Sequence, residues 1–280
     1  MKLMMITGAG ISVGSGIDTY RGADGRYTAI EKEVGMPIHT LLTQKMLQEK
    51  PELVWKYWLK FALDVQDKTP APAHLAIKAI ADQVDEFLEV TQNVDGLSVK
   101  AGLREDQLIE LHGAARRYHC MNCGRVHAIQ IEPELSIPPM CYLCDPEEGS
   151  VVRPTVVMFN ENINDEHYSR AADFAAKADV LIISGTTMQF PYLVYFVSLA
   201  IQRGAIVLYI DPEAEVNPDW LVDEWGQRYS HTATGRTISD SIFCIRKSAD
   251  EVLTLLADDF DRCLSDLAAL HQLGISSIKV

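Results

Sequence analysis

The sequence lacks the long apolar run that a membrane-spanning helix requires. No stretch approaches the roughly 20 apolar residues that cross a bilayer, and the segment Met1 to Ile6 is too short to form the apolar core of a signal peptide. We therefore expect a cytoplasmic protein that makes no direct contact with a membrane.

Positive charge is also scarce. The 280 residues include 25 Lys and Arg against 39 Asp and Glu, so the formal net charge is -14. This balance argues against attraction to nucleic acid or anionic lipid, and neither is expected as a direct partner. The apolar fraction of 48% is ordinary for a chain that buries a hydrophobic core.

Cysteine is sparse, with six residues, but four of them form two C-x-x-C pairs. In a reducing compartment such pairs indicate a metal site rather than disulfides. The pattern C-x2-C-x17-C-x2-C, from Cys120 and Cys123 to Cys141 and Cys144, is typical of a tetrahedral zinc site. Four thiolates leave no coordination position for a substrate, so we expect a structural zinc. The competing interpretation, a thioredoxin-like redox pair, predicts one pair at a helix start rather than two matched pairs.

Short apolar segments alternate with helical stretches, which is the pattern of a mostly parallel sheet covered by helices. The predicted strands are 2–7, 87–91, 108–111, 180–184 and 205–210. We expect a single α/β domain over 1–280, interrupted by a helical insertion at 24–75 and by a zinc-ribbon insertion at 114–152.

A glycine-rich segment follows the first predicted strand. Gly8, Ala9, Gly10 and Ile11 would let backbone N–H groups approach a pyrophosphate at the positive end of a following helix. The match to G-x-G-x-x-G is imperfect because Val13 stands at the third position, and a plain strand-to-helix turn explains the glycines equally well. No clear acidic residue follows a second strand as in dehydrogenases, so hydride transfer is disfavoured.

Polar residues follow the next two predicted strands. Gln92, Asn93 and Asp95 come after the second strand, and His112 comes after the third. In open α/β sheets the ligand binds beyond the carboxyl ends of the strands, where these residues would meet. A lone histidine is more often structural, but beside these groups His112 is a candidate acid or base.

The order of these motifs resembles that of the sirtuin family. The resemblance runs from Lys2 to about Leu256, nearly the whole chain. Its motifs are G-A-G-I-S at 8–12, S-G-I and Y-R-G within 15–22, T-Q-N-V-D-G-L at 91–97, L-H-G at 111–113, the two cysteine pairs, R-P-x-V-V-x-F at 153–159 and G-T-T at 185–187.

The resemblance implies an NAD-dependent protein-lysine deacylase, which transfers an acyl group from lysine to ADP-ribose and releases nicotinamide. It implies a Rossmann-type large domain, a small domain formed by the two insertions, and an acyl-lysine protein or peptide bound between them. His112 would be the general base and Asn93 the second catalytic residue. The residues expected at the NAD co-substrate are Gly8, Ala9, Gly10, Ile11, Tyr20, Arg21, Gln92, Asn93, Asp95, Gly185, Thr186, Thr187 and Asp211.

Several positions depart from the family's pattern, mostly on the acceptor side. Thr19 replaces an acidic residue, Asn160 replaces a glycine, and Phe190 stands where a valine lines the peptide groove. Two other functions therefore stay open: an NAD-consuming enzyme with another acceptor, such as a mono-ADP-ribosyltransferase or an NAD hydrolase, and a module that senses NAD without turnover. Retention of His112 favours deacylation. Asp211, in place of an asparagine, can accept from ribose hydroxyls and would repel a 2′-phosphate.

Two aromatic residues bear on the acyl group. In sirtuins that remove malonyl and succinyl groups, a tyrosine and an arginine grip the acyl carboxylate, and Trp58 and Phe61 fall at those positions here. Without a cation at either position, we expect neutral acyl groups to be preferred. The alternative is that these aromatic residues only pack the helix against its neighbours.

Overall fold

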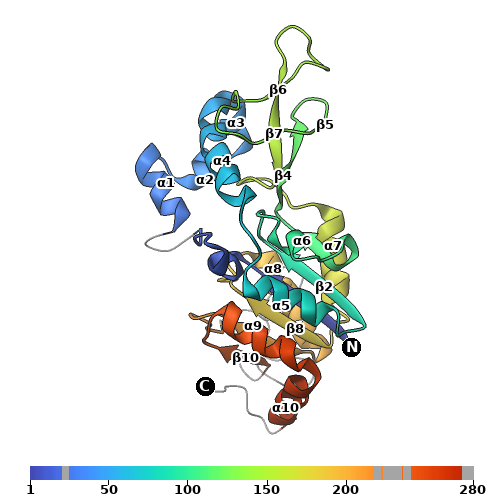
Figure 1. The fold of residues 1–280 in the computed structure, drawn as a ribbon. Coiled ribbons are helices and arrows are strands. Elements are labelled where there is room, and N and C mark those ends of the chain that lie inside the picture. The colour runs from blue at the N-terminus through green and yellow to red at the C-terminus, as the bar shows by residue number, and fades with distance from the viewer. Residues whose placement is uncertain (21–24, 217–221, 223–234, 236–240, 273–280) are drawn as a thin grey trace.

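The structure is a computed structural model, which describes residues 1–20, 25–216, 222, 235 and 241–272. Its helices and strands gather in two parts: a large part around a six-stranded sheet and a smaller part around a four-stranded sheet (Figure 1). The smaller part takes segments from both predicted insertions, whose boundaries at 24–75 and 114–152 stay predictions.

The large part is built on a parallel sheet with strand order β10-β9-β8-β1-β2-β3. Its inner strand β1 is apolar on both faces: Leu3 and Met5 join one core cluster, whereas Met4 and Ile6 join the other. This sheet confirms the predicted Rossmann-type α/β fold. The strands are β1 (Lys2–Thr7), β2 (Glu86–Thr91), β3 (Leu108–Glu110), β8 (Val180–Ser184), β9 (Ile206–Ile210) and β10 (Ile242–Ile245).

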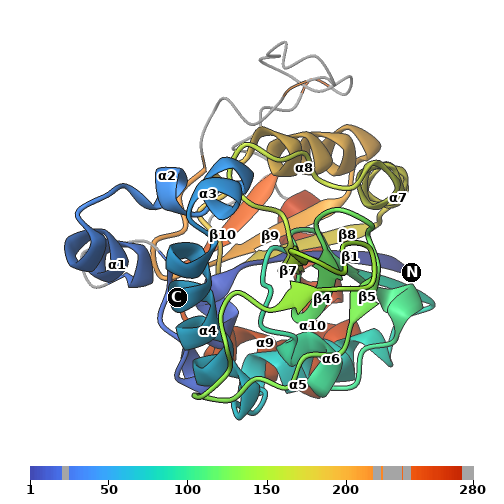
Figure 2. The ribbon, with the colours of Figure 1, turned by 90° about the horizontal axis from the view of Figure 1, so that it is seen from above.

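Helices cover both faces of this sheet. Figure 2 shows α5 (Pro72–Ala81) and α9 (Ala249–Asp258) on one side, and α7 (Asp165–Ala175) and α8 (Pro191–Arg203) on the other. Each pair buries its apolar residues in a separate core cluster, so the sheet is covered as the sequence predicts. The remaining helices of the large part are α6 (Leu97–Lys100), α10 (Phe260–Gln272) and the short 3-10 helix η2 (Glu105–Gln107).

The strand order reverses at β1. This strand pairs with β2 on one side and with β8 on the other, although β8 lies far along the chain. Loops that leave the carboxyl ends of β1, β2 and β8 therefore diverge around one crevice, which is the usual ligand site of an open parallel sheet.

The smaller part combines four helices with an antiparallel sheet of order β5-β4-β7-β6. All of these elements lie above the main sheet in Figure 1, and they share one hydrophobic core. They are α1 (Arg26–Val34), α2 (Ile38–Leu41), α3 (Gln44–Glu49), α4 (Pro51–Gln66), β4 (Gly113–Cys120), β5 (Val126–His127), β6 (Met140–Cys141) and β7 (Ser150–Val156).

A buried tryptophan joins the helices to the small sheet. Trp55 on α4 is fully buried, and its Nε1 donates to the backbone oxygen of Val152 at 2.9 Å. Its ring also stacks on Tyr118 of β4, with centroids 5.9 Å apart. Because the ring buries apolar area while its N–H finds a partner, Trp55 connects the two insertions without leaving a polar group unsatisfied.

Two local expectations differ from the structure. The glycine segment continues into a 3-10 helix, η1 (Ala9–Ser15), rather than into an α-helix. Strand β10 is absent from the predicted set, because a four-residue apolar run has no period that separates a strand from other buried segments. Among the described helices, none is long and apolar enough to cross a membrane.

Candidate active site at the carboxyl ends of the strands

Two glycine loops meet at the head of the crevice. The backbone N–H of Gly10 donates to the oxygen of Gly185 at 2.9 Å, and a Cβ added to Gly10 would lie 2.5 Å from the Cα of Gly185. Gly185 also has a φ of +65°, and a Cβ there would lie 2.5 Å from the backbone nitrogen of Ile11. No side chain fits on either glycine. The close packing of the loops after β1 and β8 therefore requires glycine at both positions.

Asn93 connects the loop after β2 to the glycine segment. Its Nδ2 donates to the backbone oxygen of Gly8 at 3.0 Å and to Ser12 Oγ at 3.2 Å, and Ser12 Oγ donates to Asp95 Oδ2 at 2.8 Å. Burial raises the pKa of Asp95, and the hydrogen bonds from the Leu97 backbone and Ser12 oppose this shift. Asn93 Oδ1 is buried and has no partner among the described residues. The site therefore keeps one buried acceptor open.

Gln92 forms hydrogen bonds with residues that follow or end three other strands. Its Nε2 donates to the backbone oxygen of Thr7 at 3.1 Å and to Thr186 Oγ1 at 2.8 Å. Its own backbone oxygen lies 3.0 Å from Nδ1 of His112. One residue at the end of β2 thus fixes the loop after β8 and orients the histidine that follows β3.

The hydrogen bond to Gln92 sets the tautomer of His112. A carbonyl oxygen only accepts, so Nδ1 carries the proton and Nε2 presents its lone pair when the ring is neutral. Burial lowers the pKa of His112 to about 4, so the ring is neutral at physiological pH. Such a histidine can accept a proton at Nε2, as a general base must.

Four other predicted site residues follow the ends of β1, β8 and β9. Ile11 is fully buried in the core against α5, so only its backbone is available to a ligand. Asp211 is half-buried at the end of β9, and burial raises its pKa. Ala9 is half-buried at the start of η1, and Thr187 is exposed after Thr186.

Tyr20 packs against the helices of the smaller part. Its ring lies 6.4 Å from that of Phe61 on α4, and 5.1 Å from that of Tyr27 on α1. It therefore belongs to the side of the crevice that the smaller part forms. Arg21 lies outside the described residues.

The four predicted zinc ligands converge in the small sheet. The Sγ atoms of Cys120, Cys123, Cys141 and Cys144 all lie within 4.8 Å of one another. Cys144 Sγ is 3.7 Å from Cys120 Sγ and 3.9 Å from Cys141 Sγ. Thiolates bound tetrahedrally at about 2.3 Å from one zinc ion are roughly 3.8 Å apart, so this group fits zinc. Because Cys120 ends the strand that begins next to His112, the ion would lie roughly 20 Å from the histidine, as suits a structural site.

Comparison with known proteins decides the family. A sequence model described as the Sir2 family matches residues 8–191. An NAD-dependent protein deacylase 2 of Pseudomonas aeruginosa is 35% identical over 240 residues, which are 85% of this chain and 88% of the relative. Another deacylase 2, from Pyrobaculum aerophilum, is 35% identical over 211 residues, or 75% and 79% of the two chains. A solved Sir2 homologue in complex with NAD superposes with a TM-score of 0.72 at 28% identity, over 94% and 90% of the chains. This chain belongs to the Sir2 family.

The sirtuin resemblance of the sequence is thereby confirmed. This sirtuin also contains groups that sequence reasoning missed, and the first is Tyr192 on α8. Its hydroxyl lies 2.5 Å from Nε2 of His112, and the ring of Phe190 stacks on its own ring at 5.3 Å. Ser12 was missed as the link between Asn93 and Asp95. Ser12 ends the G-A-G-I-S motif and no motif marks Tyr192, but neither contact is visible in the sequence because each joins segments far apart in the chain.

Glu89 is a third missed group, and here a signal was present. It is a carboxylate within a strand expected to be buried on both faces, and its exposed fraction is 0%. Thr7 Oγ1 donates to its Oε1 at 2.7 Å, and Oε2 is without a partner in the described part of the chain. Burial raises the pKa of Glu89 to about 7, and the side chains of Thr7 and Ser98 oppose this shift. The Glu89 carboxyl of this sirtuin therefore lies within β2, just before the polar residues that follow this strand.

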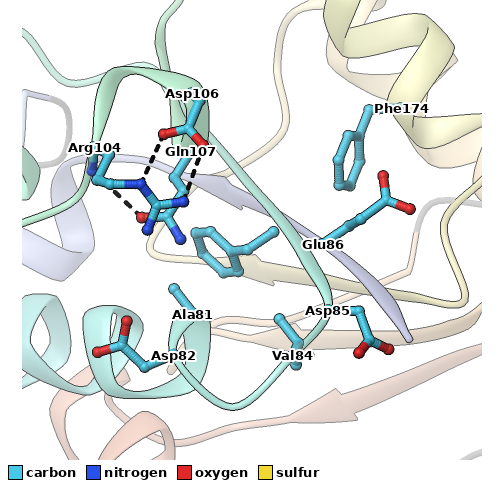
Figure 3. Close-up of a pocket in the computed structure, with 10 residues that line it drawn as sticks. Ala81, Asp82, Val84, Asp85, Glu86, Arg104, Asp106, Gln107 and Phe174 are labelled. Atoms are coloured by element: carbon cyan, nitrogen blue, oxygen red, sulfur yellow. Dashed lines mark hydrogen bonds and ion pairs between the residues drawn. The ribbon is translucent and has the colours of Figure 1, made fainter.

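A hollow of about 400 Å³ lies at the opposite edge of the sheet (Figure 3). Glu86 begins β2 there, and Arg104 holds Asp106 at 2.9 Å just before β3. These are the amino ends of the strands, away from His112 and the glycine loops. The hollow is therefore no part of the active site.

We predict that the protein contains about one zinc ion per chain, because thiolates at this spacing bind zinc as part of folding. Cys141→Ser should lose the zinc and lower the melting temperature. Cys263→Ser, which changes a half-buried cysteine outside the group, should keep the zinc. Elemental analysis of the folded proteins tests this, and zinc-free folded wild type would contradict it.

We predict that Glu89→Gln removes part of the pH dependence of stability. The folded pKa of about 7 is above the usual 4.5, so the native state binds the proton more tightly. This contribution is fully present below pH 4.5 and is lost as the pH rises through 7, by roughly 3 kcal/mol. Thermal unfolding from pH 5 to 9 should show a flatter profile for Glu89→Gln. The control Glu86→Gln changes an exposed residue of the same strand and should follow wild type. Parallel profiles for Glu89→Gln and wild type would disprove the assignment.

Proposed function

We propose that this sirtuin is an NAD-dependent protein-lysine deacylase, which transfers a neutral acyl group from lysine to ADP-ribose and releases nicotinamide. The observation that carries the proposal is the neutral His112, held by Gln92 with Nε2 as its basic nitrogen. The relatives from Pseudomonas and Pyrobaculum are named NAD-dependent protein deacylases, in agreement with this reaction.

The described residues fit NAD as the co-substrate. Asn93 Oδ1 is a buried acceptor without a partner in this part of the chain, and a ribose hydroxyl would satisfy it. Asp95 would accept from the nicotinamide carboxamide, and Asp211 from the hydroxyls of the adenosine ribose. The rest of the proposed NAD site comprises Gly8, Ala9, Gly10, Ile11, Tyr20, Arg21, Gln92, Gly185, Thr186 and Thr187.

The chain's own groups would perform binding, orientation and proton transfer. NAD, when bound, supplies the ribose bond from which nicotinamide leaves and the hydroxyl that captures the acyl group. Asn93 orients the ribose through its open oxygen. His112 takes the hydroxyl proton at Nε2, while the Gln92 oxygen stabilises the proton on Nδ1. A base with a low pKa is unprotonated before each turnover, so the histidine needs no prior deprotonation.

The alternative of a mono-ADP-ribosyltransferase or an NAD hydrolase rests on the altered acceptor side. Asn160 has a φ of +67°, which is the backbone conformation a glycine would take, so the substitution keeps the loop and adds a side chain. His112 and Asn93 both persist in the site. With the base retained and relatives named deacylases, deacylation is the better supported function.

We infer an acyl-lysine protein or peptide as the partner, and the cytoplasm as the location. The net charge of -14 disfavours nucleic acid and anionic membranes, and no described helix could span a bilayer. An acidic surface would instead favour peptides whose lysines lie among other basic residues.

We predict that His112→Ala abolishes deacylation but keeps NAD binding and part of the nicotinamide exchange, because the base acts after the glycosidic bond breaks. Asn93→Ala should lose both activities, since it removes the acceptor that orients the ribose. The measurement is deacylation of an acetyl-lysine peptide beside exchange of labelled nicotinamide. Deacylation by His112→Ala at the wild-type rate would mean that another group is the base.

We predict a preference for neutral acyl groups. Trp58 and Phe61 on α4 lie with ring centroids 5.4 Å apart and are each only 8% exposed. Arg26 lies 5.3 Å over the Phe61 ring, but its guanidinium binds Asp64 at 2.5 Å. An acyl carboxylate would meet two aromatic rings and an arginine already bound to Asp64, with the Trp58 indole N–H and Arg26 Nε as the donors that lack a partner among the described residues. A carboxylate without a cation of its own is costly to bury, whereas an aliphatic chain gains roughly 25 cal/mol per Å² that it buries.

Rates for acetyl, butyryl, longer aliphatic and succinyl lysine on one peptide test this preference. Desuccinylation within about tenfold of the best neutral group, or 1.4 kcal/mol of barrier, would refute the assignment. Arg26→Gln is the matched control. If Arg26 gripped the acyl carboxylate, this change would lower desuccinylation alone.

A further inference from the structure

We propose that Tyr192 caps the catalytic base: its hydroxyl occupies the Nε2 lone pair of His112 in the resting site and must leave before the base can act. The inference rests on the proposed role of His112 as general base, and it makes Tyr192 a residue that controls the base rather than one that touches the substrate.

The direction of the hydrogen bond follows from the partners of the imidazole. Nδ1 lies 3.0 Å from the Gln92 oxygen, which cannot donate, so Nδ1 holds the proton and Nε2 is an acceptor. The Tyr192 oxygen lies 2.5 Å from Nε2 and must supply the hydrogen. Burial raises the pKa of Tyr192, so the hydroxyl keeps its proton at physiological pH. Both ring nitrogens of His112 are therefore engaged by protein groups.

The start of α8 puts the tyrosine in this place. Pro191 occupies the first position of the helix and Tyr192 follows it in the first turn. The rings of Phe190 and Tyr192 stack at 5.3 Å with planes 10° apart, and both meet the imidazole edge-on, at centroid distances of 5.2 Å and 6.1 Å. The stacked aromatic pair thus places the hydroxyl at Nε2 in the resting site.

His112 cannot act as the base while the Tyr192 hydroxyl is bound to its Nε2. During acyl transfer the O–H bond of a ribose hydroxyl breaks, its electron pair stays on the oxygen, and the proton forms a new N–H bond at Nε2. That lone pair accepts one hydrogen at a time, and Tyr192 holds it in the resting site. Tyr192 is only half-buried, so its ring can turn toward solvent. Each turnover then requires the loss of one hydrogen bond.

The expected effect is confined to one step. Breaking the bond to nicotinamide needs no base, so the cap leaves nicotinamide exchange alone and slows only acyl transfer. A net hydrogen bond of ordinary strength corresponds to about a two- to tenfold change in rate. A general loss of folding or NAD binding would instead lower both activities together.

The test compares Tyr192→Phe with Tyr195→Phe. Tyr195 lies on the same helix and its ring stacks on Tyr168, and Tyr195→Phe serves as the matched control. Under single turnover with NAD and an acetyl-lysine peptide, Tyr192→Phe should transfer the acyl group about two- to tenfold faster than wild type. Its nicotinamide exchange should stay within twofold of wild type, and Tyr195→Phe should change neither rate.

A second readout needs neither NAD nor peptide. In protein labelled with ¹⁵N-histidine, the Nε2 resonance of His112, assigned by its loss in His112→Ala, should shift in Tyr192→Phe and not in Tyr195→Phe. An unshifted resonance would show that the hydroxyl does not bind the ring, which overturns the proposal. A shifted resonance with an unchanged or slower acyl transfer would also overturn it, because the contact would not restrain the base. If wild type shows no deacylation at all, the proposed function fails, while the resonance still tests the contact.

Discussion

The active site depends on the contact between two glycines. Gly10 and Gly185 bring the loops after β1 and β8 so close that a Cβ on either would lie 2.5 Å from backbone atoms of the other loop. This contact closes the crevice at the point where the strand order reverses, with β1 between β2 and β8. Any side chain here would push the loops apart and would separate Thr186 from Gln92.

From that contact a polar network extends to the base. Gln92 bridges Thr7 and Thr186 with its side chain and holds His112 with its backbone, and Asn93 and Ser12 connect the same loops to Asp95. The residues at the strand ends thus have two roles. They carry the buried hydrogen bonds that fix the loops, and they leave Asn93 Oδ1 without a partner among the described residues. The basic nitrogen of His112 is held by Tyr192.

Much of this arrangement is predictable from sequence. Apolar strands alternating with helices allow few topologies besides a parallel sheet, and residues after neighbouring strands must then meet at one edge. The cysteine spacing by itself likewise specifies a tetrahedral site. What the sequence does not predict depends on contacts between distant segments: the edge strand β10, the 3-10 form of η1, and the approach of Tyr192 to His112. Glu89 is partly predictable. The sequence shows a carboxylate within an apolar strand, but it does not show that Oε2 lacks a partner among the described residues.

NAD and an acyl-lysine are expected to react at this site to give a defined set of products. Mass spectrometry of a reaction with NAD and an acetyl-lysine peptide measures these directly. We expect equal amounts of free nicotinamide, deacetylated peptide and O-acetyl-ADP-ribose. ADP-ribosylated protein, or free ADP-ribose formed while the peptide stays acetylated, would contradict it.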